Sequence, residues 1–211
     1  FDCVETLHDI VSQHTQKPLL ILGGGSNILF TKDFDGLVLR NEIMGKTIVS
    51  ENEDAVLVKV GAGENWHQFV VYCIENNWGG IENLSLIPGN VGASPMQNIG
   101  AYGIEIKDVF HELEAYHIPT GELKVFSHEE CAFGYRESVF KRALKGQYVI
   151  VNVTFKLKKR NHILKTSYGD IEGELKVKNI TSPTIRDVSN AVIAIRQSKL
   201  PDPKEIGNAG S

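Results

Sequence analysis

The chain has 211 residues, of which 42% are hydrophobic and 23% charged, and its formal net charge is −4. This is the composition of an ordinary globular protein with one or two domains. The mild negative charge supplies no diffuse attraction toward nucleic acid or an anionic membrane, so we expect neither as a partner.

The cysteines, the histidines and the lengths of the apolar runs indicate which compartment and which kinds of site to expect. The cysteines are odd in number and form no C-x-x-C pair, and the seven histidines show no metal-binding spacing, so we expect a reducing compartment and no metal. No apolar run approaches the roughly 20 residues that span a bilayer, and no signal peptide is evident. A soluble, cytoplasmic protein is expected, and the ends at Phe1 and Ser211 suggest that both termini are cut.

The first predicted elements are a helix and a strand. Within residues 3–14, apolar side chains recur at helical spacing, which predicts an amphipathic helix. Pro18 ends this helix, and the apolar run Leu19–Leu22 has the length of a strand and leads into three glycines.

Later patterns predict a further series of elements, each defined by its apolar spacing or its turn residues. They are a strand over Ala55–Val60, a helix over Glu64–Asn77 with Trp66, Phe69, Val70 and Cys73 inward, a hairpin of Leu113–Ile118 with Glu122–Phe126, a helical turn over Ser127–Ala132, a strand over Tyr148–Leu157, and a helix from Thr184 to Lys199. Pro201 and Pro203 predict a domain boundary within Leu200–Lys204.

Three glycine-rich clusters are the candidate binding residues. They are Gly23, Gly24, Gly25, Ser26 and Asn27; Gly61, Ala62 and Gly63; and, within residues 88–103, Pro88, Gly89, Gly92, Ala93, Ser94, Asn98, Ile99 and Gly100. Backbone N–H groups in such turns form concave anion sites, to which the Ser and Asn side chains add donors. Any one cluster alone is also what a tight turn requires.

The long stretch 88–103 favours a ligand site over three separate turns. Its side chains are mostly small or amides, so we expect it to bury little apolar surface of its own, and long loops in compact domains are usually functional. The clusters contain neither G-x-G-x-x-G followed by a helix nor G-x-x-x-x-G-K-[ST]. The predicted phosphate site is therefore neither a Rossmann nor a P-loop site.

Five motifs in order give a resemblance over nearly the whole chain: GGGSNIL, VGAGENW, LIPGNVGASPMQNIGAYG, FGYRESVFK and KLPDPKEIGNAGS. Together they resemble the UDP-N-acetylenolpyruvoylglucosamine reductase family. The resemblance implies an α+β class with the FAD-binding fold of the vanillyl-alcohol oxidase (PCMH-type) group. It implies a small FAD-binding subdomain (1–52), a larger one (53–199), and the start (200–211) of a largely missing substrate domain.

The resemblance also implies the chemistry. In this family NADPH reduces FAD, which reduces UDP-N-acetylglucosamine enolpyruvate to UDP-N-acetylmuramate for peptidoglycan. Arg136 matches the catalytic arginine and Ser211 the proton donor, whereas a catalytic glutamate lies beyond the chain. Tyr135, Tyr168 and Lys199 match substrate-binding residues, with Tyr168 typical of the subtype that has a tyrosine loop. The three glycine clusters match the FAD loops, and we expect a monomer with a small UDP-sugar substrate.

Two alternatives remain open at this stage. One is an oxidase of the same fold group, in which FAD is often tethered covalently through His or Cys. The other is a non-catalytic module that keeps the glycine loops and binds a nucleotide only for structure or sensing. As it stands, the chain is expected to be inactive because the substrate end is incomplete.

Overall fold

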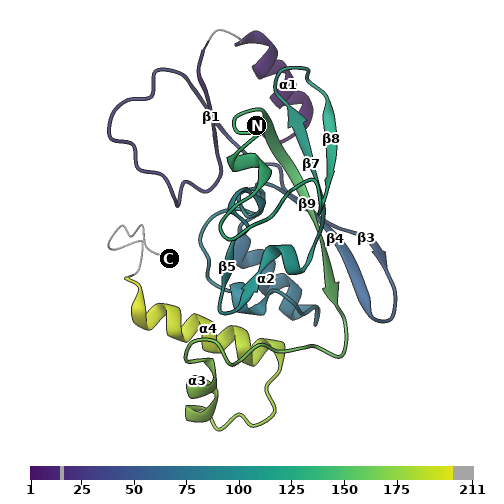
Figure 1. The fold of residues 1–211 in the computed structure, drawn as a ribbon, viewed down its shortest axis with the longest axis vertical. Helices are drawn as coiled ribbons and strands as arrows, with labels where there is room; N and C mark the ends of the chain where they lie inside the picture. The colour runs from purple at the N-terminus through teal and green to yellow at the C-terminus, as the bar shows by residue number, and fades with distance from the viewer. Residues whose placement is uncertain (15–16, 202–211) are drawn as a thin grey trace.

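The computed structural model describes residues 1–14 and 17–201, and a five-stranded antiparallel sheet forms its centre (Figure 1). In spatial order the strands are β3 (Lys46–Glu51), β4 (Ala55–Gly61), β9 (Tyr148–Lys158), β7 (Phe110–His117) and β8 (Leu123–Ser127). The predicted hairpin is confirmed as β7 and β8, and the two predicted strands as β4 and β9.

Strand β9 serves two core clusters because its register shifts against β7 between Glu114 and Ala115. Before the shift Val149 and Val151 pack in the cluster beside α1, and after it Val153 and Phe155 pack in the main core. An irregularity of this kind redirects the side chains of a strand. Strand β9 thereby contributes buried side chains to both faces of the sheet.

Helix α2 (Trp66–Glu75) covers the main core face of the sheet. The side chain of its N-cap, Asn65, accepts a hydrogen bond from the Gln68 N–H at 3.0 Å, which satisfies a donor of the first turn. The inward residues are buried as predicted: Trp66, Phe69, Val70 and Cys73.

The N-terminal segment forms a small unit beside the other face of β7 and β9. Helix α1 (Val4–Gln13) precedes the parallel pair β1 (Leu19–Leu22) and β2 (Leu37–Arg40), which are joined by residues 23–36. Leu7 and Leu39 pack against Tyr116 in one cluster. The helix and first strand match the prediction, whereas β2 was not predicted.

The C-terminal helices α3 (Ile171–Val177) and α4 (Ile185–Lys199) pack together in a third cluster. A capping box of Thr184 and Asp187 begins α4, as the sequence signals indicated. Short 3₁₀ helices and the strands β5 (Gly100–Ala101) and β6 (Ile104–Glu105) complete the order. The 3₁₀ helices are η1 (Glu82–Leu84), η2 (Val91–Ala93), η3 (Pro95–Gln97), η4 (Ile106–Asp108) and η5 (Val139–Lys141).

Other predictions have mixed outcomes. Residues 127–132 form a single turn, in which the Cys131 N–H donates to the Ser127 carbonyl at 3.2 Å.

Strand β3 pairs with β4 in the large sheet, which favours placing the first subdomain boundary before Lys46 rather than at residue 52. The subdomain division itself stays a prediction, and Pro203 lies outside the described residues.

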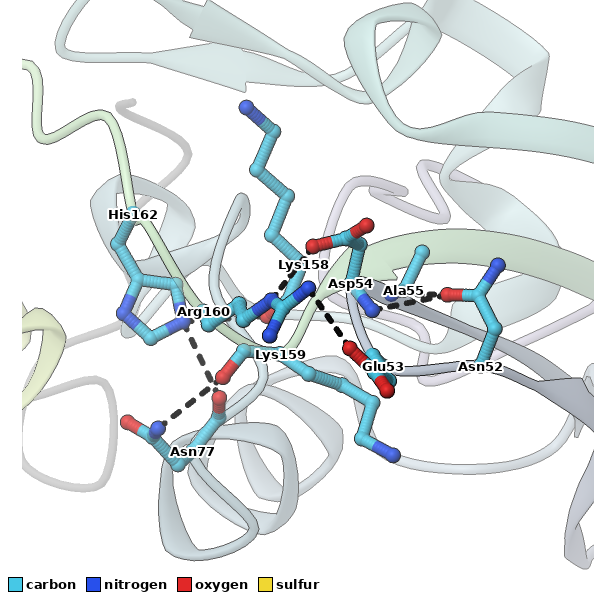
Figure 2. Close-up of polar contacts among 9 residues, drawn as sticks. All are labelled: Asn52, Glu53, Asp54, Ala55, Asn77, Lys158, Lys159, Arg160 and His162. Carbon is cyan, nitrogen blue, oxygen red and sulfur yellow. Dashed lines mark hydrogen bonds and ion pairs between the residues drawn. The ribbon is translucent and has the colours of Figure 1, made fainter.

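A polar cluster closes the end of the sheet where β3 turns into β4 (Figure 2). Arg160 contacts Asp54 at 2.6 Å and Glu53 at 3.1 Å, and this hydrogen bond and charge lower the pKa of Asp54. These side chains are exposed, where ion pairs stabilise little. Because the second glycine cluster follows the other end of β4, the ion pairs are separate from the candidate site.

Candidate functional site

The fold brings all three glycine clusters together. We call residues 23–36 the first loop, residues 61–63 the second loop and residues 88–103 the third loop. A Cβ built on Gly24 would lie 2.9 Å from Asn90 Oδ1 and 3.2 Å from Gly89 Cα, and one on Gly92 would lie 2.5 Å from Ala62 Cβ. The third loop therefore touches both of the others, and the approach leaves no room for side chains there.

The first loop keeps its backbone donors available. Among the described residues, the N–H groups of Gly23 to Asn27 make no hydrogen bond within the protein. Gly23 is half-buried, and the next four residues are exposed. Unpaired N–H groups on glycine-rich backbone, here beside the third loop, are what a phosphate site needs.

The second loop uses its donors inside the protein instead. The Gly61 N–H donates to the Gly45 carbonyl at 2.8 Å, the Ala62 N–H to Val151 at 3.0 Å, and the Gly63 N–H to Ile43 at 2.8 Å. The glycines are needed here for packing, since a Cβ on Gly63 would lie 2.7 Å from Glu42 Cα. The second loop supports the third loop, and its place in cofactor binding stays a prediction.

The third loop is buried to an extent that the sequence analysis did not expect. Val91 and Asn98 are 0% exposed and Ser94 1% exposed, so the expectation that this stretch buries little apolar surface is wrong. Short 3₁₀ turns within the loop bring Val91 and Ile99 into the main core.

The polar side chains of the third loop are also engaged internally. Ser94 Oγ donates to the Val91 carbonyl at 2.7 Å, and Asn98 Nδ2 donates to the Gly134 carbonyl at 2.9 Å. Asn98 Oδ1 accepts from the Lys107 N–H at 3.1 Å. Direct side-chain contact of Ser94 and Asn98 with a ligand stays a prediction, and the structure gives both a supporting role.

Arg136 lies on a tight turn that is docked on the third loop. Gly134 and Glu137 exchange two backbone hydrogen bonds of 3.0 and 3.3 Å around Tyr135 and Arg136, and Arg136 has a φ of +54°. Among the described residues the Arg136 guanidinium makes no ion pair. The neighbouring carboxylate of Glu137 is 2.6 Å from Arg142, which lowers the pKa of Glu137 through that hydrogen bond.

The expected substrate residues occupy different positions. Tyr135 is 84% exposed beside Arg136, and Tyr168 is 63% exposed and stacks edge-on against Tyr102 of the third loop. Lys199 is exposed in the last turn of α4. Ser211 lies outside the described residues. The structure thus brings Arg136, Tyr135 and Tyr168 to the third loop, while Lys199 comes from a separate helix.

Two buried residues that the sequence analysis did not single out connect these parts. Asn83 Nδ2 donates to the carbonyls of Tyr102 (2.9 Å) and Lys165 (2.8 Å), tying the stem of the Tyr168 segment to the third loop. Arg196 is 7% exposed beside Tyr102, and burial lowers its pKa. Arg196 directly follows Ile195 on the apolar side of α4. This position was a signal in the sequence that the arginine is buried, which is uncommon for this residue type.

Some kinds of site have no representative in the part of the chain that the structure covers. Within residues 1–14 and 17–201, no group of His, Cys, Asp and Glu side chains is placed to hold a metal ion. Over the same residues, no helix is both long and apolar enough to cross a membrane.

The fold and the loops define a flavin-binding class of protein. A model of the FAD binding domain family matches residues 2–127, more than half of the chain. The chain therefore belongs to the FAD binding domain family, and the predicted class of fold is confirmed.

Individual relatives point to one enzyme. The chain is 58% identical to the UDP-N-acetylenolpyruvoylglucosamine reductase of Flavobacterium johnsoniae over 99% of this chain and 62% of that protein. It is 53% identical to the same reductase of Burkholderia multivorans over 92% of this chain and 56% of that protein. The chain thus spans little more than half of the length of these relatives.

Solved structures support the fold. The UDP-N-acetylenolpyruvylglucosamine reductase of Thermus caldophilus is 23% identical, with a TM-score of 0.68 over 99% of this chain and 64% of that chain. A p-cresol methylhydroxylase is 16% identical, with a TM-score of 0.51 over 74% of this chain and 34% of that chain. At these identities the likeness concerns the fold alone.

FAD fits the residues present. The first loop offers unpaired N–H groups, and the absence of side chains at Gly24 and Gly89 lets the first and third loops approach each other. A diphosphate is best held by such backbone donors in a chain of net charge −4, which lacks a surplus of lysines and arginines.

Proposed function

We propose that the complete protein is an NADPH-dependent flavin reductase that converts UDP-N-acetylglucosamine enolpyruvate to UDP-N-acetylmuramate in the cytoplasm, acting as a monomer. The 58% identity to a reductase of this kind over 99% of the chain carries the proposal. The docking of the Arg136 turn on the third loop supports it, because a cation beside the flavin loops suits an anionic substrate.

Bound FAD supplies the hydride acceptor and donor, and the chain supplies binding and electrostatics. Arg136 binds the substrate carboxylate through its planar guanidinium and stabilises the negative charge that grows as the double bond is reduced. The Glu137 carboxylate is held by Arg142, so it does not neutralise Arg136. This leaves the guanidinium available to the substrate.

The remaining residues take supporting roles in this proposal. Tyr135 and Tyr168 cover the sugar nucleotide from the two segments docked on the third loop. Lys199 acts as a point charge toward the diphosphate. Ser211, which lies outside the described residues, donates the proton that completes the reduction.

An NADPH oxidation assay on the complete protein tests the proposal. We expect bound flavin and a loss of NADPH absorbance that depends on UDP-N-acetylglucosamine enolpyruvate. Arg136→Lys keeps the charge but loses the planar fork, and we expect kcat to fall by about 10²- to 10³-fold. Arg186→Lys, at an exposed position of α4, is the matched control and should leave kcat unchanged.

Two results would contradict the proposal. Bound flavin with no substrate-dependent NADPH loss would favour a non-catalytic nucleotide module. Flavin fluorescence that stays with the denatured polypeptide would show a covalent tether and favour the oxidase alternative.

A further inference from the structure

We propose that Asn98 and Ser138 are positioning residues that lock the Arg136 turn onto the third loop, so that the loop at the flavin also sets the position of the candidate catalytic arginine. Asn98 belongs to the third loop, and Ser138 belongs to the segment that contains the Arg136 turn. This inference rests on the proposed function for its kinetic test, but its structural test is independent of any activity.

Asn98 forms the first of the two connections. It is completely buried, and its φ of +43° lies in the left-handed region, which asparagine tolerates better than most residues. Its amide donates to the Gly134 carbonyl at the start of the turn and accepts from the Lys107 N–H. Both polar atoms of the side chain are therefore committed to holding segments together.

Ser138 forms the second connection, from the other end of the turn. Its side chain is 1% exposed, and its Oγ donates to the Met96 carbonyl of the third loop at 2.7 Å. The same Oγ accepts from the Phe140 N–H at 3.3 Å. The turn is thus attached to the third loop just before Tyr135 and just after Glu137.

Within the described part of the chain, the other polar contacts of the turn do not reach the third loop. Glu137 pairs with Arg142 at 2.6 Å, and the Val139 N–H donates to the Cys131 carbonyl at 2.9 Å. Beyond the pair of hydrogen bonds between Gly134 and Glu137, Lys141 Nζ donates to the Arg136 carbonyl at 3.0 Å from an exposed position. Arg136 also has a positive φ, a conformation that persists in a non-glycine residue only where the surroundings hold it. The two buried side chains, Asn98 from the third loop and Ser138 from the turn segment, join the turn to the third loop.

Two single substitutions separate the connections. Asn98→Asp keeps the tolerance for positive φ and the acceptor for the Lys107 N–H, but it removes the donor to the Gly134 carbonyl. Ser138→Ala removes the donor to the Met96 carbonyl. Ser189→Ala is the matched control, since Ser189 is 3% exposed and its hydroxyl bonds to Ser85 Oγ at 2.7 Å, away from the turn.

Amide hydrogen exchange of residues 133–139 gives the structural readout, measured on the complete protein with FAD bound. We expect the Gly134 and Glu137 amides to exchange faster in Asn98→Asp and Ser138→Ala and to stay unchanged in Ser189→Ala. Unchanged exchange in both site variants would overturn the proposal. This result does not depend on which reaction the protein catalyses.

Stopped-flow measurement of the two half-reactions gives the functional readout. Ser138→Ala is the variant for this readout, because Asn98 is itself a candidate cofactor-binding residue. In Ser138→Ala, flavin content and the rate of flavin reduction by NADPH should stay within about twofold of the unsubstituted protein, because the Arg136 turn serves the substrate. Flavin reoxidation by UDP-N-acetylglucosamine enolpyruvate should slow by about 10- to 100-fold, as expected for a misplaced catalytic group.

The pattern of loss separates positioning from general damage. Equal slowing of both half-reactions in Ser138→Ala, or loss of FAD from it, would mean that Ser138 only stabilises the fold and would overturn the proposal. If the unsubstituted protein carries out neither half-reaction, the proposed function fails, while the hydrogen exchange comparison still decides the role of Asn98 and Ser138.

Discussion

The first and third loops are both rich in glycine, yet they behave in opposite ways. The first loop is almost wholly exposed, with Leu29 at 84%, and its leading N–H groups are unpaired among the described residues. The third loop buries Val91 and Asn98 completely, and many of its N–H groups, such as those of Gly92 and Ser94, are hydrogen-bonded within the protein. Composition alone does not separate these two arrangements.

Glycine therefore serves two physical purposes at one site. In the first loop glycine exposes backbone donors to a ligand. In the third loop it permits backbone segments to pack closely, as at Gly92 against Ala62, and the resulting rigid frame carries Asn98 and through it the Arg136 turn. A cofactor site needs both a surface of free donors and a frame that fixes their position.

One methyl group added to the third loop should cost the protein the most stability. In Gly92→Ala the new Cβ would lie 2.5 Å from Ala62 Cβ and 3.1 Å from Ala62 Cα and O, so the second and third loops must separate. We expect the free energy of unfolding to fall by about 2–3 kcal/mol, the upper part of the usual range for overpacking, because the nearest contact is so short. Urea denaturation without added FAD measures it.

Gly23→Ala is the matched substitution in the first loop. The nearest atom to its new Cβ is Asn90 Cβ at 3.8 Å, an ordinary contact, so the free energy of unfolding should change by less than about 0.5 kcal/mol. FAD affinity, measured by flavin fluorescence quenching, should weaken instead. Equal destabilisation by the two substitutions would show that both loops are structural frames.

Some elements of the fold are visible in the sequence and others are not. Apolar spacing predicted α1, α2, α4, β4 and β9, because each buries one clear set of side chains. Strand β3 is exposed at every position, and the short α3 buries only Ile171 and Leu175, so neither gives a strong periodic signal. These elements depend on tertiary pairing.

The candidate site shows the same division. The glycine clusters and Arg136 were found from motifs, because their residue types are unusual in themselves. The supporting roles of Asn98, Asn83 and Ser138 depend on hydrogen bonds between segments far apart in the chain, such as Asn98 to Gly134. Local sequence carries no record of such partners, so only the structure distinguishes a ligand donor from an internal one.

A medium effect on the free energy of unfolding is expected at His67 of α2, which contacts the residues just before the third loop. His67 Nδ1 accepts from the Leu86 N–H at 3.0 Å, and burial lowers the pKa of His67. Because the pKa of this histidine is lower in the folded state than in the unfolded state, the unfolded state binds the proton first as the pH falls. Stability is therefore complete above pH about 6.5, the ordinary histidine value, and is lost as the pH falls through the folded-state pKa.

His67→Asn tests this contribution, because an amide oxygen accepts from the Leu86 N–H without titrating. Between pH 7.5 and 5.5 the unsubstituted protein should lose about 1 kcal/mol more stability than the variant, the net contribution of one hydrogen bond. Urea denaturation across this pH range measures the difference. Parallel pH profiles would show that protonation of His67 does not disturb the loop.

The smallest effect is expected at the tip of the first loop. Leu29 is 84% exposed, so Leu29→Ser removes almost no buried apolar surface and should change the free energy of unfolding by less than about 0.5 kcal/mol. The measurement is urea denaturation beside Gly92→Ala, which shows that a real loss is detectable. A loss above about 1 kcal/mol would mean that the first loop packs against the protein in solution. Its N–H groups would then be less available to a phosphate, and the contrast between the two loops would disappear.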